Sequence, residues 1–475
     1  MKNFIHKSGA LALFAGVLTL TSCDPEIDNF QPSTGAELDL TKYVAVGNSL
    51  TAGFGDNGLY REGQLNSYPA ILAQQFALVG GGEFVQPLFT QEQANGSGYL
   101  KLTGFTPTGS PITTPVTTNL ARRSPNSPLL TKFTDPINNL GVPGIKVADI
   151  KTQGYGSTQG NPYFERITPD ANAFQTYLQR VQQSDDHTFF SLWLGNNDVL
   201  SYATSGGASA AAANQITPTA TFQANYTELL DALTENDQEG ILATIPDVAG
   251  VPFFTTVGPV VKQSLTAAGA AGMVAITGAG KTRTQFATAQ INVPVTGVLF
   301  TLTGSTYAPL LGAPTGKYWR DLARSVASDP SNPLIVRGTL AQLLVNYEID
   351  TTKAFGFSAG NPWPSALLLD QTEQAAVKTA TNEFNTIIKN LATAKGLALF
   401  DANAFFTNIQ TGFSLNGVGY SPAFISGNLF SLDGVHPTPR GYAIIANEMI
   451  KAVNNTYGAK IPKVDETQYR AVVFP

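Results

Sequence analysis

The stretch Tyr43–Thr51, YVAVGNSLT, predicts a strand that ends in a polar turn and leads into a helix. Its first residues are apolar and β-prone, and Gly47 ends the run. In an open parallel sheet, polar side chains that act on a ligand lie at the carboxyl ends of the strands. Ser49 is therefore a candidate nucleophile at the edge of the first strand. The turn is not the elbow G-x-S-x-G, because Thr51 stands where the second glycine would be.

A second polar stretch near the other end of the chain, Asp433–Pro437 (DGVHP), supplies a candidate base. The chain has 3 His; His6 falls in an expected leader and His187 in an expected polar turn. An aspartate three residues before His436 can accept a hydrogen bond from Nδ1 and leave Nε2 free to take a proton from a serine. Ser49 and His436 are thus expected to work together.

Two further polar turns lie between these stretches, Asn139–Gly144 (NLGVPG) and Leu194–Asp198 (LGNND). The second follows an apolar run over residues 188–194, which predicts a buried strand. Taken singly, each polar stretch has an ordinary structural interpretation as a turn. Their order along the chain, each after or beside an expected strand end, favours one shared catalytic site.

With these four blocks the chain resembles the GDSL or SGNH hydrolases. Gly47–Leu50 resembles the first block, Gly-Asp-Ser-Leu, and Asn139–Gly144 resembles the glycine block. Gly195–Asp198 matches Gly-x-Asn-Asp, and Asp433–His436 matches Asp-x-x-His. The resemblance implies a three-layer α/β/α fold around a parallel sheet.

The resemblance also implies the role of each residue. Ser49 would be the nucleophile and His436 the base, with Asp433 behind it. The oxyanion would be held by the Ser49 amide, the Gly144 amide and the Asn197 side chain. Neither a metal nor an organic cofactor is expected.

Asn48 departs from the family pattern, which usually has aspartate at this position. Asparagine is nearly isosteric but uncharged and can donate a hydrogen bond, which predicts a change in support of the loop and not loss of the nucleophile. A serine esterase or lipase acting on acyl-ester or lipid substrates is the first expectation. A carbohydrate O-acetyl esterase is the second. The third is a surface binding lipoprotein whose catalytic site has lost its activity, which Asn48 in place of the usual aspartate suggests.

A competing serine motif, Gly356–Gly360, does fit G-x-S-x-G, and Asp401 and His436 follow it in the order of an α/β-hydrolase. However, Ser358 is followed by Asn361–Pro364 (NPWP), which cannot open the helix that the elbow requires. Ser358 is therefore not expected to be the nucleophile.

Phosphate and nucleic-acid binding are both disfavoured. Ala275–Thr282 (AITGAGKT) resembles a phosphate-binding loop, but Ala275 replaces its first glycine, and an ordinary Gly-rich turn is expected. The formal net charge is -6 and the chain has no basic run, which argues against nucleic acid.

The first residues predict a bacterial lipoprotein signal peptide over residues 1–22. Lys2 and Lys7 give a basic start, Ala10–Leu20 is a short apolar core, and Leu20–Cys23 is similar to a lipobox. Cys23 is the 1 Cys of the chain, so lipidation there would leave no disulfide and no cysteine metal site. The expected location is the bacterial cell envelope, at the outer membrane or cell surface, with the lipid on Cys23 as the membrane attachment.

The rest of the chain predicts alternating strands and helices, hence a parallel sheet. Helices are expected over 67–79, 171–183, 221–233, 340–347, 372–395 and 439–457, and strands over 188–194, 240–245 and 397–400. The expected organisation is a tether over 23–41, a hydrolase core over 42–257, an insertion or small cap over 258–363, and the rest of the core over 364–475. The insertion could line an acyl pocket or pack on the sheet edge, and the long loop 80–136 is a candidate to fold over the site.

Overall fold

The structure is a computed structural model that describes residues 31–35, 38–106, 109–125 and 127–475. The chain divides into two units, residues 1–31 and 32–475, and the second contains all the features below. The expected signal peptide and Cys23 lie outside the described residues. In the part of the chain that is described, no helix is both long and apolar enough to span a bilayer.

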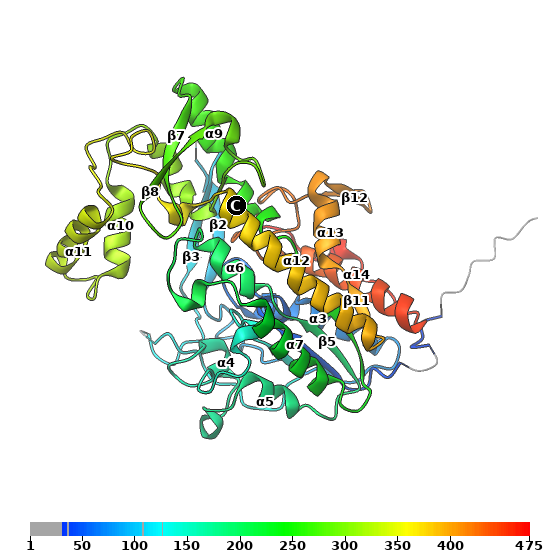
Figure 1. Cartoon of the computed structure of the whole chain (residues 1–475). Coiled ribbons are helices and arrows are strands. Elements are labelled where there is room, and N and C mark those ends of the chain that lie inside the picture. Colours follow the sequence, from blue (N-terminus) through cyan, green and yellow to red (C-terminus); the bar gives the residue numbers. More distant parts are fainter. Residues whose placement is uncertain (1–30, 36–37, 107–108, 126) are drawn as a thin grey trace, which may run out of the picture. The chain divides into compact units, whose positions relative to one another are not determined.

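A five-stranded sheet forms the centre of the second unit (Figure 1). All its neighbours are parallel, in the order β11-β6-β5-β1-β4. The strands are β1 (Tyr43–Gly47), β4 (Asn139–Gly141), β5 (Phe189–Trp193), β6 (Glu239–Ala243) and β11 (Ala398–Phe400). The last residue of β1 pairs with the last residues of β4 and β5, so the carboxyl ends of these strands lie level. The expected parallel sheet is confirmed.

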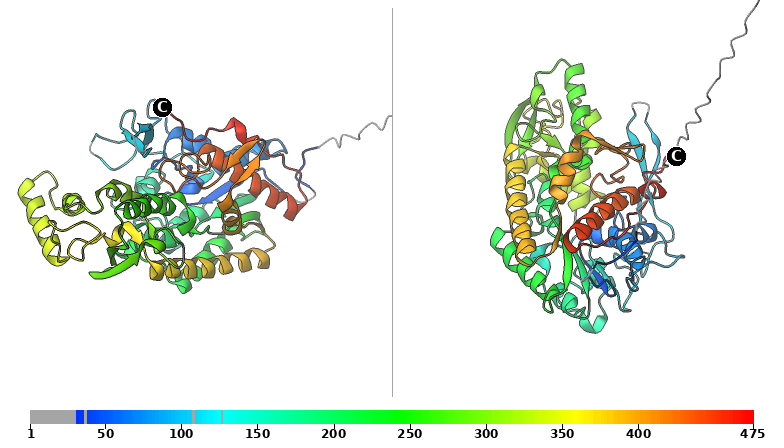
Figure 2. Two further views of the ribbon diagram at one scale, coloured as in Figure 1. Left: turned by 90° about the horizontal axis from the view of Figure 1, so that it is seen from above. Right: turned by 90° about the vertical axis from the view of Figure 1, so that its right-hand side faces the viewer.

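Helices cover both faces of the sheet, which gives three layers (Figure 2). One face is covered by α3 (Tyr68–Ala77) and α14 (Pro439–Tyr457). The other is covered by α5 (Tyr177–Gln182), α7 (Thr219–Leu233) and α12 (Gln371–Ala394). Alternate residues of β1 enter the two cores, and all five are buried, which explains its continuous apolar sequence.

One expected helix is shorter than its sequence pattern predicts. The pattern over 171–183 contains only a 3-10 turn, Asp170–Asn172, before α5 begins at Tyr177. Thr176 accepts a hydrogen bond from the Gln179 amide, and the Gln179 side chain accepts one from the Thr176 amide. This capping box fixes the start of the helix and overrides the apolar spacing that precedes it.

Shorter helices follow the strands of the sheet along the chain. They are α1 (Ser49–Ala52), α2 (Arg61–Leu65), α4 (Pro162–Arg166), α6 (Asn197–Thr204), α8 (Pro252–Thr255) and α13 (Ala402–Asn408). The expected long loop 80–136 contains an antiparallel hairpin, β2 (Tyr99–Phe105) and β3 (Pro111–Val116). A second small hairpin is formed by β12 (Phe413–Leu415) and β13 (Val418–Tyr420).

The segment 258–363 contributes most residues of a third hydrophobic cluster, which Val257, Leu367 and Leu368 complete. It contains α9 (Val257–Ala267), the hairpin of β7 (Gly272–Thr277) and β8 (Thr282–Ala287), α10 (Lys317–Val326) and α11 (Pro333–Asn346). A pair of two-residue strands, β9 (Leu299–Phe300) and β10 (Leu368–Leu369), links it to the chain that follows. The phosphate-loop lookalike is the turn between β7 and β8, as expected of a Gly-rich turn.

The described end of the expected tether is packed against the fold. Leu38 and Leu40 are buried in the core beneath α3 and α14, and Ser33 forms a bridge with Lys460. The packed part of the chain therefore begins earlier than residue 42.

Candidate active site

The turn after β1 gives Ser49 its position. A Cβ on Gly47 would lie 2.2 Å from Thr51 Oγ1 and 2.4 Å from the Trp193 carbonyl oxygen, so only glycine fits there. Asn48 caps α1, because its Oδ1 accepts a hydrogen bond from the Leu50 amide at 3.0 Å. Ser49 is the first residue of that helix and stands at the carboxyl edge of the sheet.

His436 lies in the loop before α14. Asp433 Oδ1 accepts hydrogen bonds from the amides of Val435, at 2.9 Å, and His436, at 2.8 Å. This is the turn that the ordinary structural interpretation predicts. The loop is nonetheless oriented so that the imidazole faces Ser49, 387 residues away in sequence.

Ser49, His436 and Asp433 form a continuous hydrogen-bonded chain. Ser49 Oγ lies 2.8 Å from His436 Nε2, and His436 Nδ1 lies 2.9 Å from Asp433 Oδ2. The side chains of His436 and Asp433 are 14% and 10% exposed. The Phe54 ring packs on the imidazole, with 4.7 Å between ring centroids. These distances are those of a nucleophile, a base and an orienting carboxylate.

Asp433 is held in its ionised form. Burial by itself raises the pKa of this carboxyl, but the nearby His436 and the hydrogen bonds from His436 and Val435 outweigh burial and lower the pKa to about 2. At neutral pH the carboxylate is therefore charged and can stabilise an imidazolium.

The expected oxyanion donors follow the carboxyl ends of β1, β4 and β5. Asn197 begins α6, and its Nδ2 donates to the Ile145 carbonyl at 2.9 Å, which joins it to the turn that contains Gly144. Gly144 follows β4 with a φ of 85°. Within the described part of the chain, the amides of Ser49 and Gly144 donate no hydrogen bond, so both are free to bind an oxyanion. Ser49 and Asn197 line one cavity, whereas Gly144 is not among its lining residues.

Asp198 supports this turn, a role that the sequence analysis did not assign. Its carboxylate accepts hydrogen bonds from the Val147 amide at 2.8 Å, the Ala148 amide at 3.3 Å and Thr217 Oγ1 at 2.6 Å. It is fully buried, and burial raises its pKa to about 6. Its place in the Gly-x-Asn-Asp block was the signal that could have revealed it.

Asn48 uses both ends of its amide. Its Nδ2 donates to Asn196 Oδ1 at 3.0 Å, while Oδ1 caps α1. Asn48 is completely buried, where an uncharged amide is less costly than a carboxylate. The departure from the family pattern is thus compatible with an intact nucleophile turn.

A mainly apolar cavity adjoins the Ser49 hydroxyl. The cavity is narrow, with a volume of about 40 Å³, and Asn48, Ser49, Asn197 and His436 form its polar side. Its apolar wall includes Leu50, Trp193, Leu200, Val251, Phe406 and Phe430. No residue of 80–136 or 258–363 lines it, so the walls of the cavity come from other parts of the chain.

The competing candidates lie elsewhere. Ser358 Oγ accepts a hydrogen bond from the Gly360 amide at 3.2 Å, in a turn of the insertion. Asp401 caps α13 and pairs with Lys389 at 2.6 Å. His187 is buried, with Nε2 2.9 Å from the Leu233 carbonyl oxygen, so the expectation of a simple polar turn was incomplete. Among the described residues, no group of three or more His, Cys, Asp or Glu could hold a metal ion.

A family model described as GDSL-like Lipase/Acylhydrolase matches residues 313–449. The matched segment contains Asp433 and His436, while Ser49, Gly144 and Asn197 precede it. The match and the parallel sheet agree with the family resemblance of the sequence motifs. It supports hydrolysis of ester bonds as the general class of reaction. A comparison with curated proteins finds no match to the chain.

Proposed function

We propose that this protein is a serine esterase that hydrolyses acyl esters through Ser49, His436 and Asp433. The observation that carries the proposal is the chain of two hydrogen bonds, 2.8 Å from Ser49 Oγ to His436 Nε2 and 2.9 Å from His436 Nδ1 to Asp433 Oδ2. A serine whose hydroxyl contacts an oriented imidazole is activated for attack on a carbonyl carbon.

In the proposed reaction, His436 removes the proton of Ser49 as Oγ attacks the ester carbonyl. Asp433, ionised and hydrogen-bonded to Nδ1, stabilises the imidazolium. His436 then protonates the leaving alcohol, and water repeats the two steps to release the acid and restore Ser49.

The negative oxygen of the tetrahedral intermediate would be bound by the amides of Ser49 and Gly144 and by Asn197 Nδ2. One N–H of the Asn197 side chain donates to the Ile145 carbonyl, which fixes the amide. The second N–H can then donate to the intermediate. Such a preoriented donor contributes about 3–4 kcal/mol in the transition state.

The cavity favours an acyl group longer than acetyl. Its wall beyond Ser49 is built from aliphatic and aromatic side chains, which gain free energy from an alkyl chain and nothing from a sugar hydroxyl. A carbohydrate O-acetyl esterase remains the second candidate function, since the side-chain amide of Asn196, which lines the cavity, can donate to a hydroxyl group.

A series of p-nitrophenyl esters from acetate to decanoate, assayed with wild type, Ser49→Ala and Ser358→Ala, tests the proposal. Wild type and Ser358→Ala should hydrolyse the esters, with a preference for chains longer than acetate, and Ser49→Ala should be inactive. Leu200→Trp, which narrows the cavity, should reduce turnover of the longer esters more than that of acetate. Turnover of acetate alone would favour the acetyl esterase, and a wild type inactive on all esters, including acetylated glycans, would favour the decayed binding protein.

The sequence also leads us to propose a lipid anchor on Cys23 and a place on the bacterial envelope. The support is the basic and apolar leader that ends in Leu20–Cys23. An enzyme tethered in this way would meet lipid and envelope esters at the membrane surface.

A further inference from the structure

The segment that follows the nucleophile helix, residues 53–57, contacts the loop that carries the base. Phe54 packs on the His436 imidazole, and the Asn57 amide donates to Asp433 Oδ2 at 2.9 Å. That carboxylate oxygen is the one that His436 Nδ1 contacts. Residues 53–57 therefore touch both the base and its acid from the side of the nucleophile.

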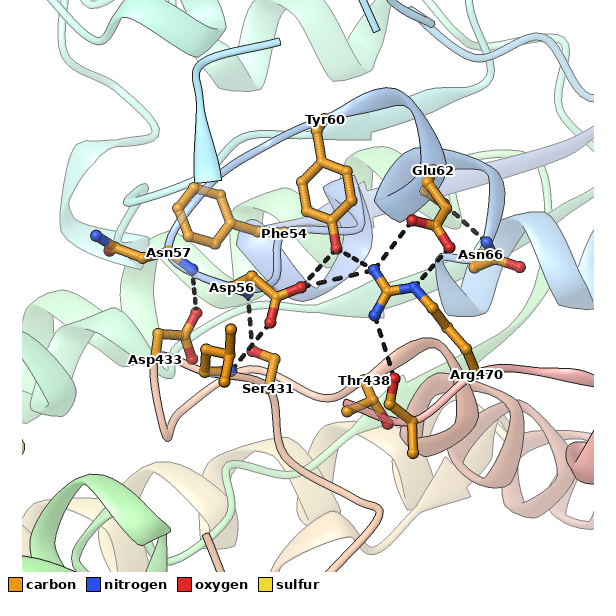
Figure 3. A network of polar contacts seen from close by, with 12 residues as sticks. Phe54, Asp56, Asn57, Tyr60, Glu62, Asn66, Ser431, Asp433, Thr438 and Arg470 are labelled. Atoms are coloured by element: carbon orange, nitrogen blue, oxygen red, sulfur yellow. Dashed lines mark hydrogen bonds and ion pairs between the residues drawn. The ribbon is translucent and has the colours of Figure 1, made fainter. Parts of the chain in front are cut away.

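Asp56 is the polar centre of this contact (Figure 3). Its Oδ1 accepts a hydrogen bond from the Leu432 amide at 3.0 Å, and its own amide donates to Ser431 Oγ at 2.9 Å. Both partners directly precede Asp433. The Asp56 side chain is buried, and burial raises the pKa of its carboxyl, against the opposing effects of the Leu432 amide and Arg470.

The backbone at this contact adopts an uncommon conformation. Asp56 and Asn57 have φ values of 52° and 62°, in the left-handed region that L-residues other than glycine seldom occupy. Two adjacent residues in that region persist only where surrounding contacts hold them. Here the left-handed backbone at Asp56 and Asn57 directs the Asn57 amide toward Asp433.

Arg470, near the other end of the chain, holds the Asp56 carboxylate. Its guanidinium lies 3.6 Å from Asp56 Oδ2, donates to the Tyr60 hydroxyl at 2.8 Å, and pairs with Glu62 at 2.6 Å. The Tyr60 hydroxyl in turn donates to Asp56 Oδ2 at 2.8 Å. Figure 3 shows the contacts that run from Glu62 through Arg470 and Asp56 to Ser431, and beside them the contact of Asn57 with Asp433.

We propose that Asp56 is a positioning residue for catalysis, which holds the 431–433 loop so that Asp433 meets His436, and that Arg470 locks Asp56 in place. The proposal rests on the proposed function of Ser49, His436 and Asp433. Asp56 touches no reacting atom; it acts through the Leu432 and Ser431 contacts. Leu432 and Val472 also belong to one hydrophobic cluster, so the segment after α14 supports this loop through apolar packing as well as through Arg470.

The test compares Asp56→Ala, Asp56→Asn and Arg470→Met in ester turnover and in the proton NMR signal of His436 Nδ1–H at acidic pH. A small displacement of a catalytic group costs about tenfold to hundredfold in rate, so Asp56→Ala should lower kcat by that factor with KM nearly unchanged. Asp56→Asn keeps an oxygen for the Leu432 amide and should recover part of the loss. Arg470→Met should act in the same direction, and each affected variant should shift or broaden the far-downfield Nδ1–H signal.

Glu165→Gln is the matched control. Glu165 is a fully buried carboxylate held by Arg123 at 2.6 Å and Lys132 at 2.9 Å, and its ion-pair partners in the described chain do not include residues 431–436. This variant should lower the melting temperature and leave kcat and the His436 signal unchanged. If Asp56→Ala is too unstable to purify, the same comparison of kcat and of the His436 signal is made with Asp56→Asn and Arg470→Met.

Folded Asp56 and Arg470 variants with wild-type kcat and an unaltered His436 signal would overturn the proposal. Equal losses of kcat in Glu165→Gln would also overturn it, because they would reflect lost stability alone. A wild type that hydrolyses no ester would refute the proposed function, while the His436 signal would still decide whether Asp56 positions the loop.

Discussion

Replacing Asp433 with asparagine tests how the imidazole is oriented. The two oxygens of Asp433 accept four hydrogen bonds, from the His436 ring at 2.9 Å and from the amides of Asn57 at 2.9 Å, Val435 at 2.9 Å and His436 at 2.8 Å. All four partners are donors, so an amide nitrogen at either oxygen position faces an N–H. The imidazole can relieve this conflict by moving its proton from Nδ1 to Nε2. A protonated Nε2 can no longer accept the proton of Ser49.

The expected loss is large in kcat and smaller in stability. The wrong tautomer costs about 10⁴-fold in kcat, or about 5 kcal/mol of transition-state stabilisation. The pKa of Asp433 is lowered to about 2 from its ordinary 3.8, so the charged carboxylate contributes about 2 kcal/mol to folding. That contribution is fully present above about pH 4 and is lost as the pH falls toward 2.

Steady-state kinetics on a p-nitrophenyl ester, with denaturant unfolding at neutral pH, measures both quantities. Asp433→Asn should remain folded, retain KM and lose nearly all of kcat. Asp401→Asn is the control, since Asp401 caps α13 and has its own partner, Lys389. A folded Asp433→Asn variant that keeps kcat within about tenfold of wild type would refute the orienting role, because the wrong tautomer cannot sustain that rate.

The remaining predictions concern the oxyanion donors and the anchor. Asn197→Ala should lower kcat by about 10²–10³-fold and change KM little, because the donor faces charge that exists only in the transition state; a rise in KM alone would make Asn197 a substrate contact. Burial raises the pKa of Asp198 from its ordinary 3.8 to about 6. The contribution of Asp198 to the free energy of unfolding therefore falls by about 3 kcal/mol as the pH rises from about 4 to 6. The stability advantage of wild type over Asp198→Asn should shrink over that interval in denaturant titrations, and a constant difference would contradict the buried titration. Cys23→Ser should abolish lipidation and release the protein from the membrane fraction, and a variant that still sediments with membranes would rule out the anchor.

The fold was predictable where one local pattern dominates. The apolar runs at Tyr43–Gly47 and Phe189–Trp193 are buried on both faces of a parallel sheet, and such strands are recognisable from composition alone. The helix Pro439–Tyr457 has a capping Thr438 and a left-handed Gly458, so its ends match the expected range. The shortened helix at Tyr177 shows the limit, because the capping box there decided the boundary against the apolar spacing.

The contacts among Ser49, His436 and Asp433 were predictable from the sequence, but the residues that support them were not. Ser49, Asp433, His436 and Asn197 stand in short motifs at strand ends, where residue type and order carry the chemistry. The Asp56 contact with Leu432 joins positions 376 residues apart and depends on a backbone turn with positive φ at two non-glycine residues. No local spacing encodes such a pairing, because it arises from the packing of two loops. For the same reason the sequence did not reveal that residues 246–251, and not the insertion, line the cavity.

The central claim is that Ser49 is the nucleophile, and a fluorophosphonate probe tests it most directly. The probe forms a stable covalent bond with a serine only when a base activates its hydroxyl. Mass spectrometry of digested, labelled protein should find the adduct on the peptide that contains Ser49, and His436→Ala should prevent labelling. An adduct on Ser358, or labelling that persists in Ser49→Ala, would contradict the account.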